Sequence, residues 1–448
     1  MQFIEACRKL ISIDSSVSQG NLEVVRFAAQ EARRMGLEVE LQNEFDGGLE
    51  QANIIIRPLA GKPAQEVLFQ NHLDTPDPGH FQLWADNAHN PFEAVIKENK
   101  IYGLGSADVK LDFLCKLHAL ASFVGIEAWK CPPVLVGTFG EESGMQGMLK
   151  LIRRQKVNAR MALVGEPSDL KLITAAKGFA VIEIKVPFSQ SELAYKKDHD
   201  LRESTSTQSR IFRGKSAHSS TPHLGESAVI KLFDFLRELP EGIAILQIDG
   251  GTASNIIPSN AMLELDTVSH IQNPIKQKIL KIYEGIKDLE KDFLKFRDED
   301  FSPPYPTLSI GTVRTTEDSI LISGNCRVPP VISQSVYELW MRKIQNVCEE
   351  QGADFRVLDY KKPFRTPGES SLVKVCLEEM DHAGIPPRIS TQASTNEASL
   401  LSRVGIDCVC FGPGPREGNI HTPHEHVSLS DLEKATEFYK RIIERLCL

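Results

Sequence analysis

Short apolar runs that end in acidic residues or histidine recur along this sequence, and they constrain its fold more than any other feature. One such run is 133–136, and the adjacent acids Glu141 and Glu142 follow it. Neighbouring side chains on an extended chain point in opposite directions, so the two carboxylates can face different groups. Carboxylates at the end of a buried strand are costly unless a positive group compensates them. A metal ion would be such a group, whereas this pair alone also fits a solvated surface loop.

Helical and strand-like patterns alternate in the first third of the chain. Apolar residues at helical spacing lie in 21–35 and 111–124. Runs typical of buried strands lie in 54–56, 67–69, 134–136 and 162–164. Strands separated by helices predict an α/β fold, with a mixed, largely parallel sheet flanked by helices. After Gly178 the pattern changes to alternating strands and one long helix after Pro274, which indicates an α+β insertion.

The chain has 448 residues, which is too long for one ordinary core, so we predict two domains. The α/β pattern resumes late in the chain, and Ser430 with Glu433 predicts a capping box at the start of a last helix. The catalytic domain is therefore expected to be discontinuous. Its parts are 1–178 and 364–448, and the inserted domain is 179–363.

Composition narrows the classes of partner. The formal net charge is -9, which disfavours a nucleic-acid or anionic-membrane partner. The charged first residues are not followed by an apolar stretch that could serve as a signal core or a membrane span. Nine scattered cysteines are typical of reduced thiols. We therefore expect a cytoplasmic protein that has a small-molecule partner.

Four more segments place histidine or acids after apolar or glycine-rich stretches. His72 and Asp74 follow 67–69, and they lie on one side of an extended strand, where the aspartate could orient the imidazole. Asp108 ends a glycine-rich loop, Glu166 follows 162–164, and His421 lies in 418–425. Each of these residues alone also fits a core histidine, a loop cap or a turn acid. Their joint occurrence at strand ends, where α/β sheets bind ligands, favours a metal site.

The donor set suits zinc, with cobalt or manganese as alternatives. Five ligands and one spare acid indicate two divalent ions rather than one. One aspartate could bridge such a pair, with the ions about 3.5–4 Å apart.

These segments, taken in order, resemble the zinc-dependent amidohydrolases and exopeptidases, a family that includes acetylornithine deacetylase, succinyl-diaminopimelate desuccinylase, glutamate carboxypeptidase and several dipeptidases. The matching motifs are Asn-His-Leu-Asp at 71–74, Gly-Ser-Ala-Asp-Val-Lys at 105–110, Glu-Glu-Ser-Gly at 141–144, Gly-Glu-Pro-Ser at 165–168 and His-Thr-Pro-His-Glu at 421–425. Two further matches lie in the inserted part, at 217–222 and 250–258. The resemblance spans essentially the whole chain, and it implies that the insertion is a lid and dimerisation domain.

The resemblance also assigns roles to residues. It implies one zinc held by His72, Asp108 and Glu166, and a second held by His421, Asp108 and Glu142, so that Asp108 bridges the two. Asp74 would orient His72. Glu141 would act as the general base toward a zinc-activated water and pass the proton to the leaving amine.

Substrate-binding residues are implied in the inserted domain. His218 resembles a histidine that stabilises the tetrahedral oxyanion, often from the partner subunit, and Asn255 resembles a substrate-binding asparagine. Arg327 resembles an arginine that grips a substrate carboxylate, although a strand-end surface arginine is the alternative. A homodimer through the inserted domain is a further expectation of the resemblance.

The sequence thus predicts a metallohydrolase that cleaves an amide bond in a small N-acyl amino acid, as acetylornithine deacetylase does. A dipeptidase or carboxypeptidase of the same family is the alternative, and a catalytically inactive binding protein with the same fold is the second alternative. Two departures from the family pattern bear on this. Leu111 and Asp112 stand where the family often has two glycines, and the loop 394–399 is closer to the deacetylase type than to the desuccinylase type.

Overall fold

The computed structural model describes residues 2–58, 65–199, 207–268 and 274–448. The chain folds into two compact units. Unit 1 consists of Met1–Ala175, Phe364–Thr391 and Asn396–Leu448, and unit 2 consists of Ala176–Pro363 and Gln392–Thr395. The roles assigned from sequence to 1–178, 179–363 and 364–448 stay predictions, and each unit is described below by itself.

A nine-stranded sheet forms the centre of unit 1 in the described residues. Its order is β1 (Glu38–Asp46), β2 (Leu49–Arg57), β6 (Pro133–Thr138), β3 (Glu66–His72), β7 (Ala159–Gly165), β18 (Asp407–Phe411), β8 (Leu172–Ala176) and β16 (Phe364–Arg365), and β17 (Ile389–Gln392) also pairs with β8. The central strands β6, β3, β7 and β18 run parallel. Strands β1, β2 and β8 pair antiparallel at the two sides of this centre. All residues of β3 and β6 are buried, as their continuous apolar runs predict.

Helices cover both faces of this sheet. Five helices pack with the sheet into one hydrophobic cluster: α1 (Phe3–Ile11), α2 (Leu22–Arg34), α3 (Lys110–Ala121), α9 (Ser371–His382) and α11 (Leu429–Cys447). Helices α4 (Gln146–Arg153) and α10 (Ala398–Arg403) contact the sheet and each other but contribute no described residue to that cluster, which places them on the other face. The predicted α/β class with a mixed sheet flanked by helices is confirmed. Its parallel part is confined to the centre of the sheet.

A small three-stranded sheet joins two distant segments of unit 1 in the described chain. It consists of β4 (Val95–Lys97), β5 (Lys100–Tyr102) and β19 (His426–Ser428). His426 pairs with Tyr102 in this sheet, and their rings lie 5.0 Å apart. Strand β19, which leads directly into α11, is therefore paired with β5, the strand that precedes the loop of Asp108.

The start of α11 corrects one prediction. The helix begins at Leu429, and Ser428 is its N-cap residue, although no side-chain capping bond forms. Ser430 lies inside the first turn, where its hydroxyl is 2.8 Å from that of Ser428. The predicted capping box of Ser430 and Glu433 is wrong because β19 ends directly at the helix and starts it two residues earlier.

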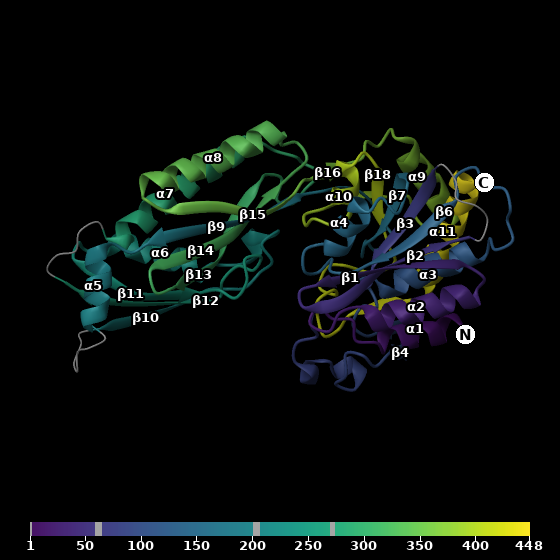
Figure 1. Ribbon diagram of the computed structural model, residues 1–448, viewed down its shortest axis with the longest axis horizontal. Helices are drawn as coiled ribbons and strands as arrows, with labels where there is room; N and C mark the ends of the chain where they lie inside the picture. The colour runs from purple at the N-terminus through teal and green to yellow at the C-terminus, as the bar shows by residue number, and fades with distance from the viewer. Residues whose placement is uncertain (1, 59–64, 200–206, 269–273) are drawn as a thin grey trace. The chain divides into compact units, whose positions relative to one another are not determined.

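Unit 2 is an α+β structure. In the part of the chain that is described, its sheet has seven antiparallel strands: β10 (Gln208–Arg213), β12 (Asn260–Thr267), β11 (Ile243–Gly250), β13 (Thr307–Thr315), β14 (Ser319–Val328), β9 (Gly178–Pro187) and β15 (Asp354–Lys361). Helices α6 (Ala228–Glu238), α7 (Ile275–Phe293) and α8 (Gln334–Glu350) share one hydrophobic cluster with this sheet, and α7 and α8 lie side by side (Figure 1). Helix α5 (Gln190–His199) and the 3-10 turn η3 (Pro222–Leu224) complete the described elements of unit 2, and two further 3-10 turns, η1 (Phe81–Leu83) and η2 (Ala85–Asn87), lie in unit 1.

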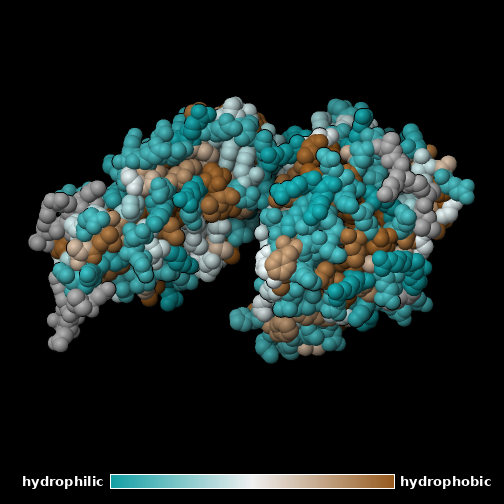
Figure 2. Space-filling view, viewed as in Figure 1, coloured by the Kyte–Doolittle hydropathy of each residue, from teal (hydrophilic) through white to brown (hydrophobic). Residues whose placement is uncertain are grey.

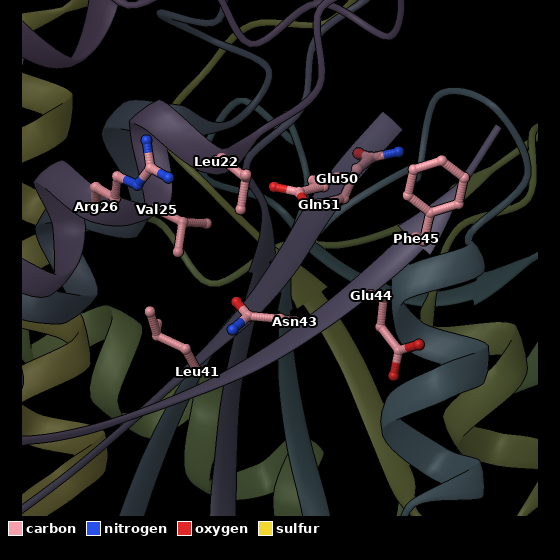
Figure 3. A pocket seen from close by; sticks show the side chains of 9 residues that line it. All are labelled: Leu22, Val25, Arg26, Leu41, Asn43, Glu44, Phe45, Glu50 and Gln51. Carbon is pink, nitrogen blue, oxygen red and sulfur yellow. The ribbon is translucent and has the colours of Figure 1, made fainter. Parts of the chain in front are cut away.

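Hydrophilic residues predominate on the face that Figure 2 shows, with several patches of hydrophobic residues between them. No helix in the described residues is both long and apolar enough to cross a membrane. One hollow in unit 1 lies between α2 and the β1–β2 hairpin, and Phe45 stands at its rim (Figure 3). Its lining includes none of the predicted site residues, so the functional argument turns to the strand ends.

Candidate metal centre

The predicted acids and histidines gather at one edge of the unit 1 sheet. Strand β3 ends at His72, and Glu141 and Glu142 follow β6. Glu166 directly follows β7. Because β6, β3 and β7 are parallel neighbours, their carboxyl ends meet at the same edge. Asp108 enters this region from the loop before α3.

Asp108 faces two histidines with its two carboxylate oxygens. Its Oδ1 lies 3.1 Å from His72 Nε2, and its Oδ2 lies 3.4 Å from His421 Nε2. Burial alone would raise the pKa of Asp108, but hydrogen bonds from the two histidines and their charges hold that pKa well below its usual range. A carboxylate that presents one oxygen to each imidazole has the arrangement required of a bridging ligand.

His421 also approaches Glu142. Its Nε2 lies 3.2 Å from Glu142 Oε1, and the donor atoms of Asp108, Glu142 and His421 all lie within 4.8 Å of one another. Burial opposes the charged imidazole, but the carboxylates of Asp108 and Glu142 raise the pKa of His421 to about 11. Glu142 Oε1 is buried and accepts no hydrogen bond among the described residues, despite its short distance from His421. A metal ion between these atoms would satisfy this oxygen.

A second group consists of His72, Glu141 and Glu142, whose donor atoms also lie within 4.8 Å of one another in the described chain. His72 Nδ1 lies 3.0 Å from the backbone oxygen of Asp74, which can only accept. The imidazole proton is therefore placed on Nδ1, and the lone pair of Nε2 is left for a metal. Burial opposes the charged form, but Asp108 and the other nearby carboxylates hold the pKa of His72 well above its usual range.

Asp74 supports both the histidine and the glutamate pair. Its carboxylate accepts the backbone N–H groups of Glu141 at 3.2 Å and Glu142 at 3.1 Å, and its Oδ1 is 3.8 Å from His72 Nδ1. Burial raises the pKa of Asp74 to about 6. Asp74 thus contacts His72 mainly through its backbone oxygen, whereas its side chain fixes the turn that carries the two glutamates.

Glu166 lies at the same sheet edge but has a different neighbour. Its Oε2 lies 3.2 Å from Arg416 Nη1, and its side chain is buried. Neither of the two groups of closely spaced donor atoms in the described residues includes Glu166. Its metal-binding role stays a prediction, and Arg416 is a neighbour that the sequence did not indicate.

The residues present fit a divalent cation. Burial, together with the charge of Glu142, raises the pKa of Glu141 well above its usual range. Several carboxylates therefore converge with the buried His72 and the half-exposed His421, and the repulsion among the carboxylates needs a compensating charge. Imidazole and carboxylate donors suit zinc, cobalt or manganese.

A buried charged network stands behind this edge, where the sequence departs from the family's glycine pair. Lys116 Nζ lies 3.0 Å from Asp112 Oδ2, and both side chains are inaccessible to solvent. Asn71, the neighbour of His72, donates to the same oxygen of Asp112 at 2.8 Å. The Tyr439 hydroxyl donates to Asp112 Oδ1 at 2.8 Å. The four-residue spacing of Asp112 and Lys116 in an apolar helix was a usable signal for this pair.

Glu397 is a further buried acid on the α4–α10 side of the sheet. Its Oε2 accepts a hydrogen bond from the Thr138 hydroxyl at 2.9 Å and one from the side-chain amide of Gln70. Gln70 and His72 lie on the same side of β3, because side chains two apart share a face. Glu397 therefore lies near His72, whose charge acts on it. The sequence singled out the loop 394–399 by resemblance, but it did not place the Glu397 side chain beside Gln70 and Thr138.

The residues predicted to bind substrate lie in unit 2, where the structure brings them together. The N–H of Ser219, next to His218, donates to the backbone oxygen of Asn255 at 2.9 Å. Arg327, which is buried, donates from Nη2 to the Ser219 hydroxyl at 3.4 Å. The backbone N–H of Ser220 donates to His218 Nδ1 at 3.2 Å. Because Nδ1 accepts, the neutral imidazole of His218 carries its proton on Nε2.

Comparison with known proteins identifies the family of this chain. Residues 68–445 match the model of Peptidase family M20/M25/M40. An acetylornithine deacetylase of Myxococcus xanthus is 23% identical over 451 residues, which cover 98% of this chain and 96% of the relative. An acetylornithine deacetylase of Aliivibrio fischeri is 26% identical over 450 residues, which cover 97% and 94%.

Solved structures share the fold across the whole chain. The aminoacylhistidine dipeptidase of Vibrio alginolyticus gives a TM-score of 0.65 at 15% identity and covers 99% of this chain and 96% of its own. An M20 family metallo-carboxypeptidase of Sulfolobus solfataricus gives a TM-score of 0.64 at 16% identity and covers 99% of each chain. With the match over 68–445, these findings place the chain among enzymes that hydrolyse amide or peptide bonds: it belongs to peptidase family M20/M25/M40.

Proposed function

We propose that this protein is a metal-dependent deacylase of a small N-acyl amino acid, similar in activity to acetylornithine deacetylase. The observation that carries the proposal is Asp108, whose two oxygens face His72 and His421. The full-length match to acetylornithine deacetylases supports the substrate class. A related protein of the same fold, with a TM-score of 0.53, is described as a dinuclear metal-binding peptidase, which supports two metal positions.

The two positions would share Asp108. His72 and Glu166 would complete one position, and Glu142 and His421 the other, with zinc as the favoured ion. Two divalent cations bound there would polarise the amide carbonyl and lower the pKa of a water molecule. Glu166 would have to exchange its contact with Arg416 for the metal, whereas the other residues already face one another.

Glu141 would move the proton. Its backbone is fixed by Asp74, and burial together with the charge of Glu142 raises the pKa of its carboxyl, which makes Glu141 a better proton acceptor than an ordinary glutamate. In this proposal a carboxylate oxygen of Glu141 takes the proton of the attacking water and delivers it to the leaving amine nitrogen. Asp74 keeps the turn that carries Glu141 in place during both transfers.

Residues of unit 2 would recognise the substrate. The Nε2–H of His218 is a suitable donor for the developing oxyanion, and Asn255 stands next to it through Ser219. The guanidinium of Arg327 lies 4.2 Å from the ring of Phe179, which holds it in place for a substrate carboxylate. We further propose a homodimer through the inserted unit, which sizing in solution would test.

A hydrolysis panel tests the proposal. N-acetyl amino acids, N-succinyl amino acids and dipeptides are incubated with zinc-loaded protein, and release of free amine is measured. We expect N-acetyl amino acids to be hydrolysed fastest, whereas fastest cleavage of dipeptides would assign the alternative dipeptidase function. Metal analysis should find about two ions per chain, as a two-metal clamp requires. Absence of bound metal after supplementation would contradict the proposal.

A Glu141→Gln variant tests the general base. We expect kcat to fall by about 10²- to 10⁴-fold while metal content stays unchanged. Glu127→Gln, in an exposed loop, is the control and should keep full activity. Full activity of the Glu141 variant would show that another group moves the proton.

A further inference from the structure

Glu425 is a buried acid that joins two metal-binding loops. It follows His421 by four residues, and its side chain is 1% exposed. Its Oε1 accepts the backbone N–H of Ala107 at 2.9 Å and the backbone N–H of Asp108 at 3.1 Å. The carboxylate therefore contacts the backbone of the bridging residue itself, although the two residues are 317 positions apart in sequence.

Further bonds make this contact part of a rigid connection. The N–H of Gly103 donates to the backbone oxygen of Glu425 at 3.1 Å. The next residue, His426, pairs with Tyr102 in the β19–β5 ladder. The loop that begins at Gly103 and ends at Asp108 is thus held at its start by strand pairing and at its end by the carboxylate.

Asn419 closes the loop that carries His421 through hydrogen bonds of its side chain. The Asn419 amide donates to the backbone oxygens of Pro415 and His426, each at 2.9 Å. The N–H of His426 donates to Asn419 Oδ1 at 3.0 Å. Because Glu425 lies within this closed loop, a displacement of its carboxylate would change the distance between Asp108 and His421.

Charge acts in both directions at this position, because burial and the Asp108 carboxylate oppose a charged Glu425, whereas the backbone N–H groups and Lys110 favour it. A carboxylate that accepts two backbone N–H groups makes charge-assisted hydrogen bonds, which are about twice as strong as neutral ones. The ammonium of Lys110, which donates to the backbone oxygen of Ile13 at 3.1 Å, is fully buried and interacts electrostatically with Glu425. A neutral side chain at 425 would therefore hold the Asp108 backbone less firmly and remove a compensating charge from Lys110.

We propose that Glu425 is a positioning residue that fixes Asp108 relative to His421 and thereby sets the affinity of the metal position formed by Asp108, Glu142 and His421. The inference rests on the proposed metal site. The main effect is expected at this position, because Glu425 is bonded to the loop of Asp108 and lies in the loop of His421, whereas of the other position it holds only the shared Asp108.

Metal binding by the full-length protein tests this inference. Metal-free wild type, Glu425→Gln and Glu425→Ala are titrated with Co²⁺ and with Zn²⁺ against a chelator of known affinity. Loss of an outer partner of a metal ligand lowers metal affinity by about 10- to 100-fold, and we expect this loss at one position in Glu425→Ala. Glu425→Gln keeps an acceptor oxygen, so its loss should be smaller.

Glu66→Gln is the matched control. Glu66 is also a buried acid of unit 1, and its Oε2 accepts the backbone N–H of Asn158 at 3.1 Å. It stands at the opposite end of β3 from His72, so its replacement should leave both metal affinities unchanged. Urea unfolding of the metal-free variants shows whether stability alone accounts for any difference.

The outcomes separate the inference from the proposed function. Wild-type affinity in both Glu425 variants, or an equal loss in the Glu66 control, would overturn the positioning role. His421→Ala should lose one metal position altogether. If His421→Ala binds both ions as tightly as the wild type, or the wild type binds none, the proposed metal site itself fails. Loss of one position in His421→Ala, together with about 10- to 100-fold weaker binding at that position in Glu425→Ala, supports both.

Discussion

Replacing Lys116 with methionine removes a buried charge from the network behind the metal-binding edge. Lys116 donates to the backbone oxygen of Gln70 and to Asn71 Oδ1, each at 2.9 Å, and lies 3.0 Å from Asp112 Oδ2. Methionine fills most of the same space but has no N–H group. The Asp112 carboxylate would remain buried with the neutral amide of Asn71 and the neutral hydroxyl of Tyr439 as donors.

The magnitude follows from the burial of both charges. Breaking a buried ion pair by removal of one partner destabilises a protein by about 3–5 kcal/mol. Lys116 and Asp112 are both inaccessible to solvent, so we expect the free energy of unfolding of unit 1 to fall by about this amount. Combining Lys116→Met with Asp112→Asn neutralises both charges, and the double variant should recover about 2 kcal/mol relative to the sum of the single changes.

Urea unfolding of the metal-free protein measures this effect. The chain has three tryptophans, and Trp84 and Trp129 lie in unit 1 whereas Trp340 lies in unit 2. A Trp340→Phe background therefore makes tryptophan fluorescence report unit 1. Lys434→Met is the control, because Lys434 is 44% exposed and its pair with Asp431 is a surface pair worth about 0–1 kcal/mol.

Two results would refute the reasoning. An unfolding midpoint of Lys116→Met within the range of the Lys434→Met control would show that the buried pair does not stabilise unit 1. Strict additivity in the double variant would show that Lys116 and Asp112 act independently, despite the 3.0 Å between their charged atoms.

Three further changes test other parts of the structure. Gly165→Ala would place a Cβ in collision with Asn71 Nδ2 and 2.7 Å from Asp112 Oδ2, so urea unfolding should show that the free energy of unfolding falls by about 1–3 kcal/mol. Burial raises the pKa of Glu397 from 4.5 to about 8, so the folded state binds its proton more tightly. The stabilisation that the bound proton of Glu397 provides is complete below pH 4.5 and is lost as the pH rises through about 8. Glu397→Gln should therefore make the free energy of unfolding of the metal-free protein less dependent on pH over this range. Arg327→Met should raise KM by about 10- to 100-fold for a substrate with a free carboxylate. An equal rise for its carboxamide would contradict the carboxylate-binding role.

The sequence predicted the elements of unit 1 that have a strong local pattern. The apolar runs at 67–69, 134–136 and 162–164 lie inside β3, β6 and β7, because a continuous apolar run can be read within a few residues. The start of α11 was placed two residues too late. Local capping signals compete there with strand pairing of His426–Ser428, which involves a segment far away in sequence.

For the candidate site, the sequence indicated which residues gather but not how they contact one another. The motifs placed His72, Glu141 and Glu142 at strand ends, and parallel neighbouring strands bring such ends together. The contacts of Asp74 were harder to predict from the sequence. Spacing predicted that Asp74 orients His72, and its Oδ1 lies 3.8 Å from His72 Nδ1, but the same carboxylate also accepts the N–H groups of the glutamate turn. That contact depends on the pairing of β3 with β6, which no local pattern contains.

The departure at 112 shows why the supporting residues could not be derived from sequence. A buried carboxylate in place of glycine requires compensation from nearby groups. Lys116 lies one helical turn away and could be inferred from spacing, but the Tyr439 hydroxyl comes from a residue 327 positions later. The two charges are therefore linked: glycine at 112 alone would leave the buried ammonium of Lys116 without its carboxylate. Glycine at this position should be tolerated only together with an uncharged residue at 116.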